Sequence, residues 1–124
     1  MEQRDQLTEL VIGAAIEVHR IMGPGLLESI YQQCMERELK LRNCIVEPQT
    51  RIPLTYKGLP LGEDLVMDLY FPDRLVVEIK AVERLHPVHE AQLLTYLKLS
   101  RTHVGLLINF NVPVLVQGIK RMVL

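Results

Sequence analysis

The stretch from residue 65 to residue 81 constrains the fold more than any other part of this sequence. Two runs rich in β-branched, apolar and aromatic residues, 66–71 and 75–80, flank the short segment Pro72-Asp73-Arg74. Such runs on either side of turn-forming residues are typical of a β-hairpin. We therefore expect two antiparallel strands with a connection of three residues.

This hairpin brings two acidic residues together. If Phe71 faces Leu75 across the turn, Asp68 lies opposite Glu78. Cross-strand neighbours have Cβ atoms roughly 5 Å apart, where like charges destabilise the pairing. A cation between the carboxylates removes the repulsion, and a divalent metal ion with oxygen ligands is the natural candidate. Because side chains alternate between faces, one face carries Asp68, Tyr70, Val76, Glu78 and Lys80, and the other carries Leu75, Val77 and Ile79.

A plainer interpretation is that both acids lie on the wet face of an antiparallel sheet, with Lys80 as a neutralising neighbour. The surrounding residues favour a site instead. Strands that are apolar on both faces usually have both faces covered. Charges inside such strands are costly unless they serve a purpose.

The composition indicates one folded domain. The chain has 124 residues, 48% of them hydrophobic, which supports a single core over residues 1–124. No apolar stretch is long enough for a signal peptide or a membrane span, so we expect a cytoplasmic protein without a membrane partner. Cys34 and Cys44 lack a metal-ligand or disulfide spacing, which favours free thiols.

The charge distribution limits the role that nucleic acid can play. The formal net charge is −1, and the basic residues are scattered along the chain. A protein that coats nucleic acid by itself needs a concentrated basic surface. A nucleic-acid role would therefore depend on a local patch, a homodimer or a protein partner.

The remaining pattern predicts a mixed α/β (α+β) fold. Residues 104–110 are almost purely apolar and follow a predicted helix, so with strand 75–81 they form a βαβ unit with a right-handed crossover. Pro48 and Pro53 cannot donate ladder hydrogen bonds, which places their strand at an edge. The other elements that we expect are a helix over 6–21, a second helix ending near 42, an edge strand over 45–56, a helix over 88–99 with Ala91, Leu94 and Leu97 facing inward, and a last strand over 114–123.

Several short motifs occur in a recognisable order. Together they resemble the GxxExxY protein family, a prokaryotic branch near the RecB-type nucleases within the PD-(D/E)XK nuclease superfamily. The resemblance covers nearly the whole chain and implies a restriction-endonuclease-like core: a mixed central sheet with an antiparallel carboxylate hairpin and a βαβ crossover, flanked by helices. The motifs are Glu17-Val18-His19-Arg20, Gly23-Pro24-Gly25, Gly25-Leu26-Leu27-Glu28-Ser29-Ile30-Tyr31, Asp68, Glu78-Ile79-Lys80-Ala81, His89-Glu90-Ala91-Gln92 with Tyr96, and Gly105-Leu106-Leu107-Ile108-Asn109-Phe110.

The resemblance implies a metal site and a catalytic lysine. Asp68 and Glu78 would bind Mg²⁺ or Mn²⁺ with the help of the Ile79 carbonyl. Lys80 would position or activate the attacking water and stabilise the charge that builds on the phosphate. Hard oxygen ligands suit Mg²⁺, which keeps several waters and lowers the pKa of one of them.

Four further residues are candidates with plainer alternatives. Glu28 would complete the catalytic metal site from its helix, directly or through water, or it simply benefits from the macrodipole in a first helical turn. His19 is a competing metal ligand, or a packed core histidine. Gln92 and Tyr96 are four residues apart and share a helix face, so Gln92 would assist catalysis and both would bind substrate, or Tyr96 belongs to the core.

The predicted function is a metal-dependent nuclease that hydrolyses phosphodiester bonds in DNA or RNA, with DNA as the first expectation. An alternative is a non-catalytic module that keeps the nuclease fold and binds nucleic acid or protein. A metal-dependent hydrolase of another phosphoester would use the same residues. All three interpretations depend on whether Asp68, Glu78 and Lys80 converge.

Overall fold

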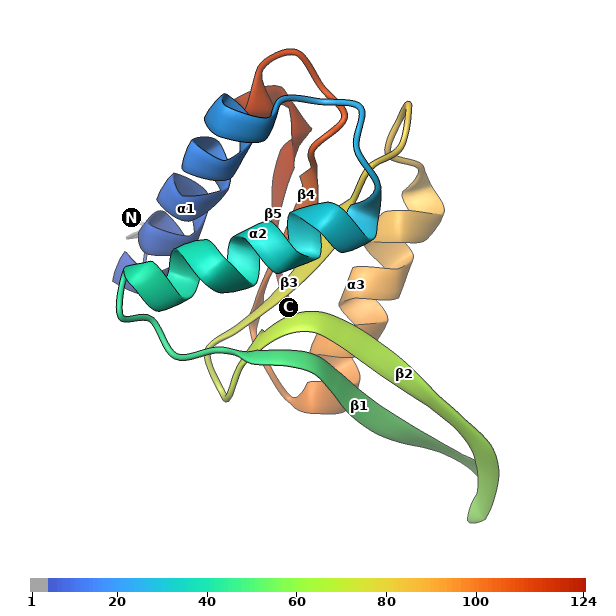
Figure 1. The fold of residues 1–124 in the computed structure, drawn as a ribbon. Coiled ribbons are helices and arrows are strands. Elements are labelled where there is room, and N and C mark those ends of the chain that lie inside the picture. Colours follow the sequence, from blue (N-terminus) through green and yellow to red (C-terminus); the bar gives the residue numbers. More distant parts are fainter. Residues whose placement is uncertain (1–4) are drawn as a thin grey trace.

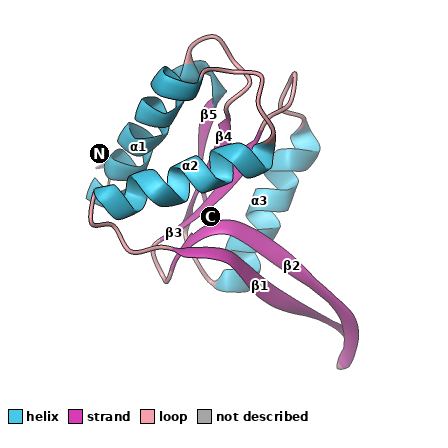
Figure 2. Ribbon diagram, viewed as in Figure 1, coloured by secondary structure: helices cyan, strands magenta, loops and turns pink. Residues whose placement is uncertain are grey.

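The fold of residues 5–124 is described by a computed structural model (Figures 1 and 2). None of the helices in this described part of the chain combines the length and hydrophobicity that a membrane crossing requires. The elements in chain order are α1 (Gln6–Met22), α2 (Glu28–Leu41), β1 (Glu47–Tyr56), β2 (Leu59–Phe71), β3 (Leu75–Lys80), α3 (Pro87–Ser100), β4 (Val104–Asn109), the 3₁₀ helix η1 (Leu115–Gly118) and β5 (Ile119–Val123).

The strands form one mixed sheet in the order β1-β2-β3-β4-β5. Strands β3 and β4 are parallel and joined through α3, whereas the other neighbouring pairs are antiparallel. This arrangement confirms the predicted hairpin, the βαβ unit and the edge position of β1. The hairpin has the expected register, with Phe71 paired to Leu75.

Helices cover both faces of the sheet. On one face, α1 and α2 bury Val11 and Tyr31 in a core cluster that also contains Val77 and Leu106. On the other face, α3 packs its apolar side chains in a cluster with Val76 of β3. Figure 1 shows α1 and α2 crossing in front of the strands, with α3 on the far side. Strands β3 and β4 are therefore enclosed between two layers, as their apolar sequences indicated.

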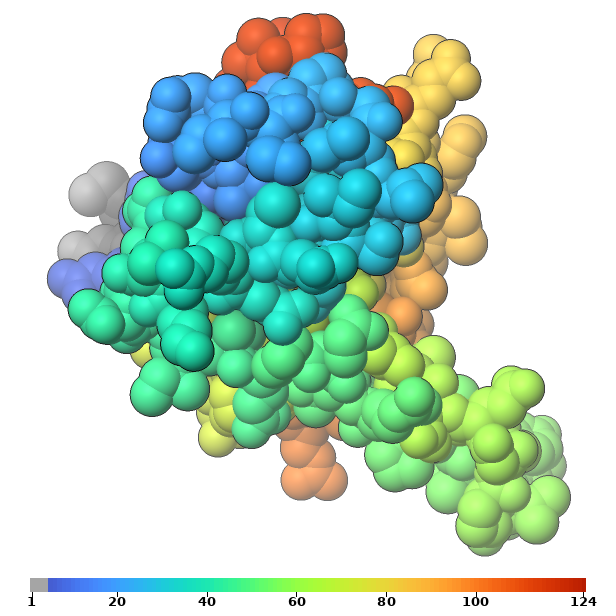
Figure 3. Space-filling view, viewed as in Figure 1, coloured from blue at the N-terminus to red at the C-terminus, as the bar shows by residue number. Residues whose placement is uncertain are grey.

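The outer parts of β1 and β2 leave this body as a two-stranded ribbon, which Figure 3 shows projecting into solvent. Its turn has positive φ angles at Lys57 (47°) and Gly58 (82°), as a two-residue hairpin turn of type I′ requires. Tyr56 and Leu59 beside the turn are exposed. The base of the ribbon carries Asp68.

The inward face of α3 differs from the predicted one. Leu97 is buried as expected, but Ala91 is exposed and Leu94 only half-buried. Leu93 and Tyr96 are buried instead and pack in the cluster beneath the sheet. Because leucines occur on several sides of this helix, periodicity alone did not identify the buried face.

The predicted last strand over 114–123 is divided in two. Residues Leu115–Gly118 form η1, and only Ile119–Val123 pair with β4 as β5 at the sheet edge. The chain passes so close to the end of β4 that a Cβ atom at Gly118 would overlap the carbonyl oxygen of Asn109. This close approach explains the tight turn where the apolar run suggested a longer strand.

Tyr31 fastens the break between α1 and α2. Its hydroxyl donates to the carbonyl of Gly23 at 2.6 Å and accepts from the backbone N–H of Leu26 at 3.1 Å. Its ring stacks on Phe110 with the centroids 4.5 Å apart. One side chain thus joins the interhelical loop to the end of β4.

We predict that Tyr31→Phe lowers the free energy of unfolding by about 1–2 kcal/mol, because two partly buried backbone groups lose their partner while the ring stays in place. Urea titration followed by circular dichroism measures this change. Tyr56→Phe is the matched control, since Tyr56 is 61% exposed on the ribbon. Equal stabilities of the two variants would contradict the prediction.

Candidate active site

The candidate site lies where β2 separates from β3. The two strands pair at three positions only, Phe71 with Leu75, Tyr70 with Val76 and Leu69 with Val77. The next position holds Asp68 and Glu78. The pairing predicted from the sequence therefore ends at the two acids.

The two carboxylates replace the missing ladder hydrogen bonds. Asp68 Oδ2 accepts the backbone N–H of Ile79 at 2.7 Å, and Glu78 Oε1 accepts the backbone N–H of Asp68 at 3.1 Å. Each acid thus binds a backbone group of the opposite strand. The expected proximity of the two side chains is present, at the point where the pairing of β2 and β3 ends and a pocket begins.

Burial and mutual repulsion disfavour ionisation of both acids together. Glu78 is 4% exposed. Its pKa is raised to about 9, first by burial and then by the charge of Asp68. Burial also raises the pKa of Asp68, opposed mainly by the hydrogen bond from Ile79. Without a cation, the folded protein therefore keeps a proton in this pair at neutral pH.

Lys80, Gln92 and Tyr96 meet on the α3 side of the acids. Lys80 Nζ donates to Gln92 Oε1 at 3.3 Å. Burial, followed by the charges of Glu78 and Asp68, raises the pKa of Tyr96 to about 12, so its hydroxyl keeps its proton. The face shared by Gln92 and Tyr96 is thus turned toward the hairpin, as the sequence predicted.

Two glutamines that the sequence did not single out hold Asp68 in place. Gln32 Nε2 donates to the Asp68 carbonyl at 2.8 Å, and Gln49 Nε2 lies 3.4 Å from Asp68 Oδ1. Gln32 lies four residues after Glu28 on the same helix, which was the available signal. No pattern marked Gln49. The surrounding pocket of about 380 Å³ is lined by Glu28, Ser29, Gln32, Gln33, Gln49, Asp68 and Ile79.

Glu28 and His19 each bind a backbone group away from the two acids. Glu28 lines the pocket, but its Oε1 accepts the backbone N–H of Ala81 at 3.3 Å. His19 Nε2 lies 2.8 Å from the Val112 carbonyl, and its ring lies beside Phe110. Within residues 5–124, no three side chains of His, Cys, Asp or Glu form a group that could hold a metal ion. The packed role of His19 is the one that the geometry favours.

The donor set nevertheless fits a hard divalent cation. Mg²⁺ is commonly held by one or two carboxylates and keeps several waters, so Asp68, Glu78 and the Ile79 carbonyl are sufficient. Gln32 adds a second indication. Its Nε2 donates to two acceptors, which fixes the orientation of the amide, and its buried Oε1 has no partner among the described residues. A water bound to a cation could donate to this oxygen.

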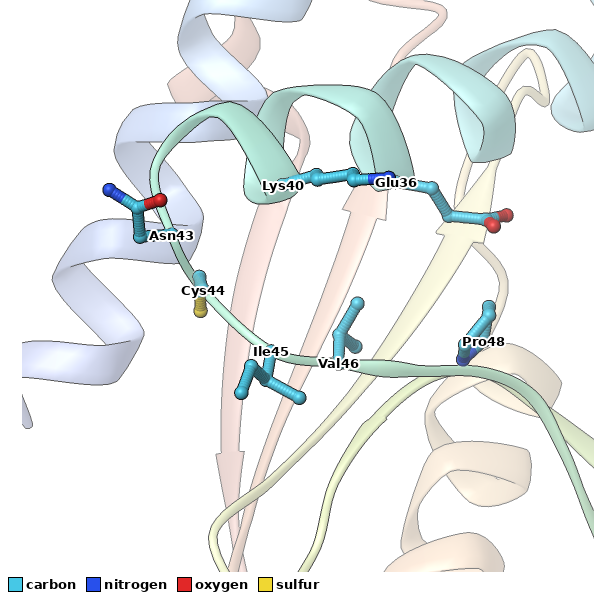
Figure 4. A pocket seen from close by; sticks show the side chains of 7 residues that line it. All are labelled: Glu36, Lys40, Asn43, Cys44, Ile45, Val46 and Pro48. Atoms are coloured by element: carbon cyan, nitrogen blue, oxygen red, sulfur yellow. The ribbon is translucent and has the colours of Figure 1, made fainter.

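A larger hollow of about 530 Å³ lies elsewhere, between α2 and the segment that leads into β1 (Figure 4). Glu36 is its only acidic lining residue, and no second acid faces it there. Its other lining residues are Lys40, Asn43, Cys44, Ile45, Val46 and Pro48. This hollow lacks the paired acids, so the smaller pocket at Asp68 is the candidate site.

A mixed five-stranded sheet flanked by helices, with two acids and a lysine where two strands separate, defines the restriction-endonuclease-like class of folds. A sequence model of the PD-(D/E)XK nuclease superfamily matches residues 5–122. The chain therefore belongs to the PD-(D/E)XK nuclease superfamily, whose nucleases generally use divalent metal ions. No curated protein and no solved structure matches the chain.

We predict that the metal-free protein loses stability as the pH rises from about 4.5 toward 9. The folded state keeps the Glu78 proton in this range and the unfolded chain releases it, so the stabilisation is complete below pH 4.5 and is lost as the pH passes through the folded pKa of about 9. Glu78→Gln should therefore raise the free energy of unfolding at pH 8 by about 1–3 kcal/mol.

Urea unfolding in EDTA at several pH values measures this effect. Glu63→Gln, on the exposed ribbon, is the control and should follow the wild type. Parallel pH profiles for the wild type and Glu78→Gln would show that Glu78 is not protonated in the folded protein.

Proposed function

We propose that this protein is a Mg²⁺- or Mn²⁺-dependent nuclease that hydrolyses phosphodiester bonds, and that it belongs to the GxxExxY branch near the RecB-type enzymes. The observation that carries the proposal is the buried pair Asp68 and Glu78, which needs a proton or a cation between its carboxylates. Membership of the nuclease superfamily implies nucleic acid as the substrate.

In this proposal Asp68, Glu78 and the Ile79 carbonyl hold the ion. When bound, the ion would neutralise charge on the phosphate and lower the pKa of a coordinated water. Its charge would also replace the proton that the two acids otherwise share. The hydrogen bonds from Ile79 and Gln49 keep the Asp68 carboxylate oriented before the ion arrives.

Lys80 would supply the charge on the other side of the reacting phosphate. Gln92 accepts one hydrogen bond from the ammonium group, which fixes its direction and leaves two N–H donors. One can orient the attacking water and another can bind a phosphate oxygen as negative charge develops. Tyr96, which keeps its proton, is a further donor at the same place.

The substrate is proposed to be DNA in the first place, with RNA as the alternative. The formal net charge of −1 gives the whole chain little general attraction for a polyanion. We therefore propose that nucleic-acid binding relies on a local basic patch beside the site. A second copy of the chain or a partner protein would enlarge the binding surface.

A second candidate function is a non-catalytic binding module. It is favoured by the arrangement of Glu28, whose carboxylate binds the backbone of Ala81 and does not complete a three-acid site. Such a module would bind its partner without a metal ion. Titration with Mn²⁺ distinguishes the two functions: heat that disappears in Asp68→Asn supports the nuclease, and the absence of heat supports the module.

We predict that wild-type protein cleaves DNA or RNA in Mg²⁺ or Mn²⁺ and that Lys80→Ala reduces the rate at least about 100-fold, because a positioned charge at the developing phosphate anion is lost. Gel analysis of labelled substrates measures the rates. Lys98→Ala removes the same charge from an exposed position in the last turn of α3 and should cleave normally.

Circular dichroism should show that Lys80→Ala is folded. Cleavage of equal rate by the wild type and this variant would end the proposal, because the activity would then come from other residues or from a contaminant.

A further inference from the structure

Another pocket, distinct from the two described above, is lined by residues that follow Lys80 in the chain. It has a volume of about 360 Å³ and lies between the segment that leaves β3 and the start of α3. Its lining residues are Val82, Glu83, Arg84, His86 and His89. None of them is needed for the proposed chemistry, so the pocket requires its own explanation.

One wall of this pocket is held by a buried amide. Asn109, at the end of β4, is 2% exposed. Its Oδ1 accepts the backbone N–H of Val82 at 3.0 Å, and its Nδ2 donates to the Val82 carbonyl at 2.9 Å. Both ends of the amide thus bind the backbone of one residue, Val82. The segment after Lys80 is therefore fixed to the central strand, as expected of a preorganised binding surface.

The hydrogen bonding of His89 presents a donor to the pocket. Its Nδ1 accepts the backbone N–H of His86 at 3.0 Å, so the proton of the neutral ring lies on Nε2. Burial, followed by the charges of Lys80 and His86, lowers the pKa of His89. The neutral ring therefore offers a single N–H donor, and the influence of Lys80 shows that it lies near the site.

The charge at this pocket suits an anion. Arg84 is exposed and forms no hydrogen bond or ion pair within residues 5–124. Glu83 is the one acidic lining residue, and Arg84 balances it. Lys80 and Glu28 influence the pKa of His89 in opposite directions, so their charges oppose each other beside the pocket. The attraction for an anion therefore comes from the N–H donors of Arg84 and His89 and from the positive end of the α3 helix dipole.

We propose that this pocket binds a phosphate of the nucleic-acid strand next to the phosphate that Lys80 contacts, with Arg84 and the Nε2–H of His89 as its ligands. This inference deepens the proposed function, since it names the surface that aligns the strand. The planar guanidinium of Arg84 can donate two hydrogen bonds to one phosphate group. A phosphate site of this kind would also explain how a chain of near-zero net charge binds a polyanion.

Binding of a short fluorescein-labelled single-stranded oligonucleotide in EDTA tests the proposal, because no cleavage then occurs. We expect Arg84→Ala to weaken binding about tenfold. The slope of log K against log salt should decrease in magnitude by about 0.7, as for one lost phosphate contact. Lys98→Ala, which removes one positive charge at the other end of α3, should leave both quantities unchanged.

A pair of variants at His89 separates binding from helix capping. Gln and Glu at this position can both accept the N–H of His86, as in a capping box, so both variants should keep the stability of the wild type. Glu places a negative charge in the pocket and should weaken oligonucleotide binding about tenfold relative to Gln. Equal binding by the two variants would overturn the role of His89.

The outcomes distinguish this inference from the proposed function. If Lys80→Ala abolishes cleavage but Arg84→Ala binds with the affinity and salt slope of the wild type, the phosphate pocket is wrong and the nuclease stands. If the wild type cleaves no substrate but Arg84→Ala weakens binding as expected, the phosphate pocket is supported and the nuclease activity is not. A wild type that binds no oligonucleotide overturns the pocket.

Discussion

The rest of the structure depends on two hydrogen bonds that the carboxylates of Asp68 and Glu78 accept across the hairpin. Each carboxylate binds the backbone of the opposite strand at the point where β2 leaves β3. The strands can therefore separate without leaving buried backbone donors unpaired. The pocket beside α2 lies at this separation, and two carboxyl groups that resist joint ionisation meet there. One pair of side chains thus ends the strand pairing and supplies the carboxylates of the proposed metal site.

Much of the fold was predictable because its main elements have strong local patterns. The hairpin register followed from the three residues between Phe71 and Leu75, and the parallel pairing of β3 with β4 followed from a strand, a helix and an apolar strand in succession. The prediction of the buried face of α3 was wrong because apolar residues occur on several sides of this helix. The predicted last strand was too long. The close approach of Gly118 to the Asn109 carbonyl, which leaves no room for a Cβ atom, is a tertiary constraint that no local pattern contains.

The candidate site was predictable in its charged members and in the pair Gln92 and Tyr96 of α3. Asp68, Glu78 and Lys80 were identified because charges are costly inside apolar strands. Gln32 and Gln49 were missed, because polar residues on a helix or an edge strand are ordinary and their contacts with Asp68 arise only on folding. For His19 the sequence left two interpretations open, a metal ligand and a packed core residue, and its partner in the fold is the Val112 carbonyl from a distant loop.

The short segment after β3 connects the two parts of the proposed machinery. Lys80 ends the strand, Glu28 binds the backbone of Ala81, and Asn109 binds both polar groups of Val82. Ala81 is thus fixed by a residue of α2 and Val82 by a residue of β4, although these two residues belong to neither a helix nor a strand. Such fixation lowers the entropy that a substrate would otherwise have to remove on binding. In the proposed mechanism, this fixed exit from β3 would let the position of the phosphate at Lys80 determine where the neighbouring phosphate binds.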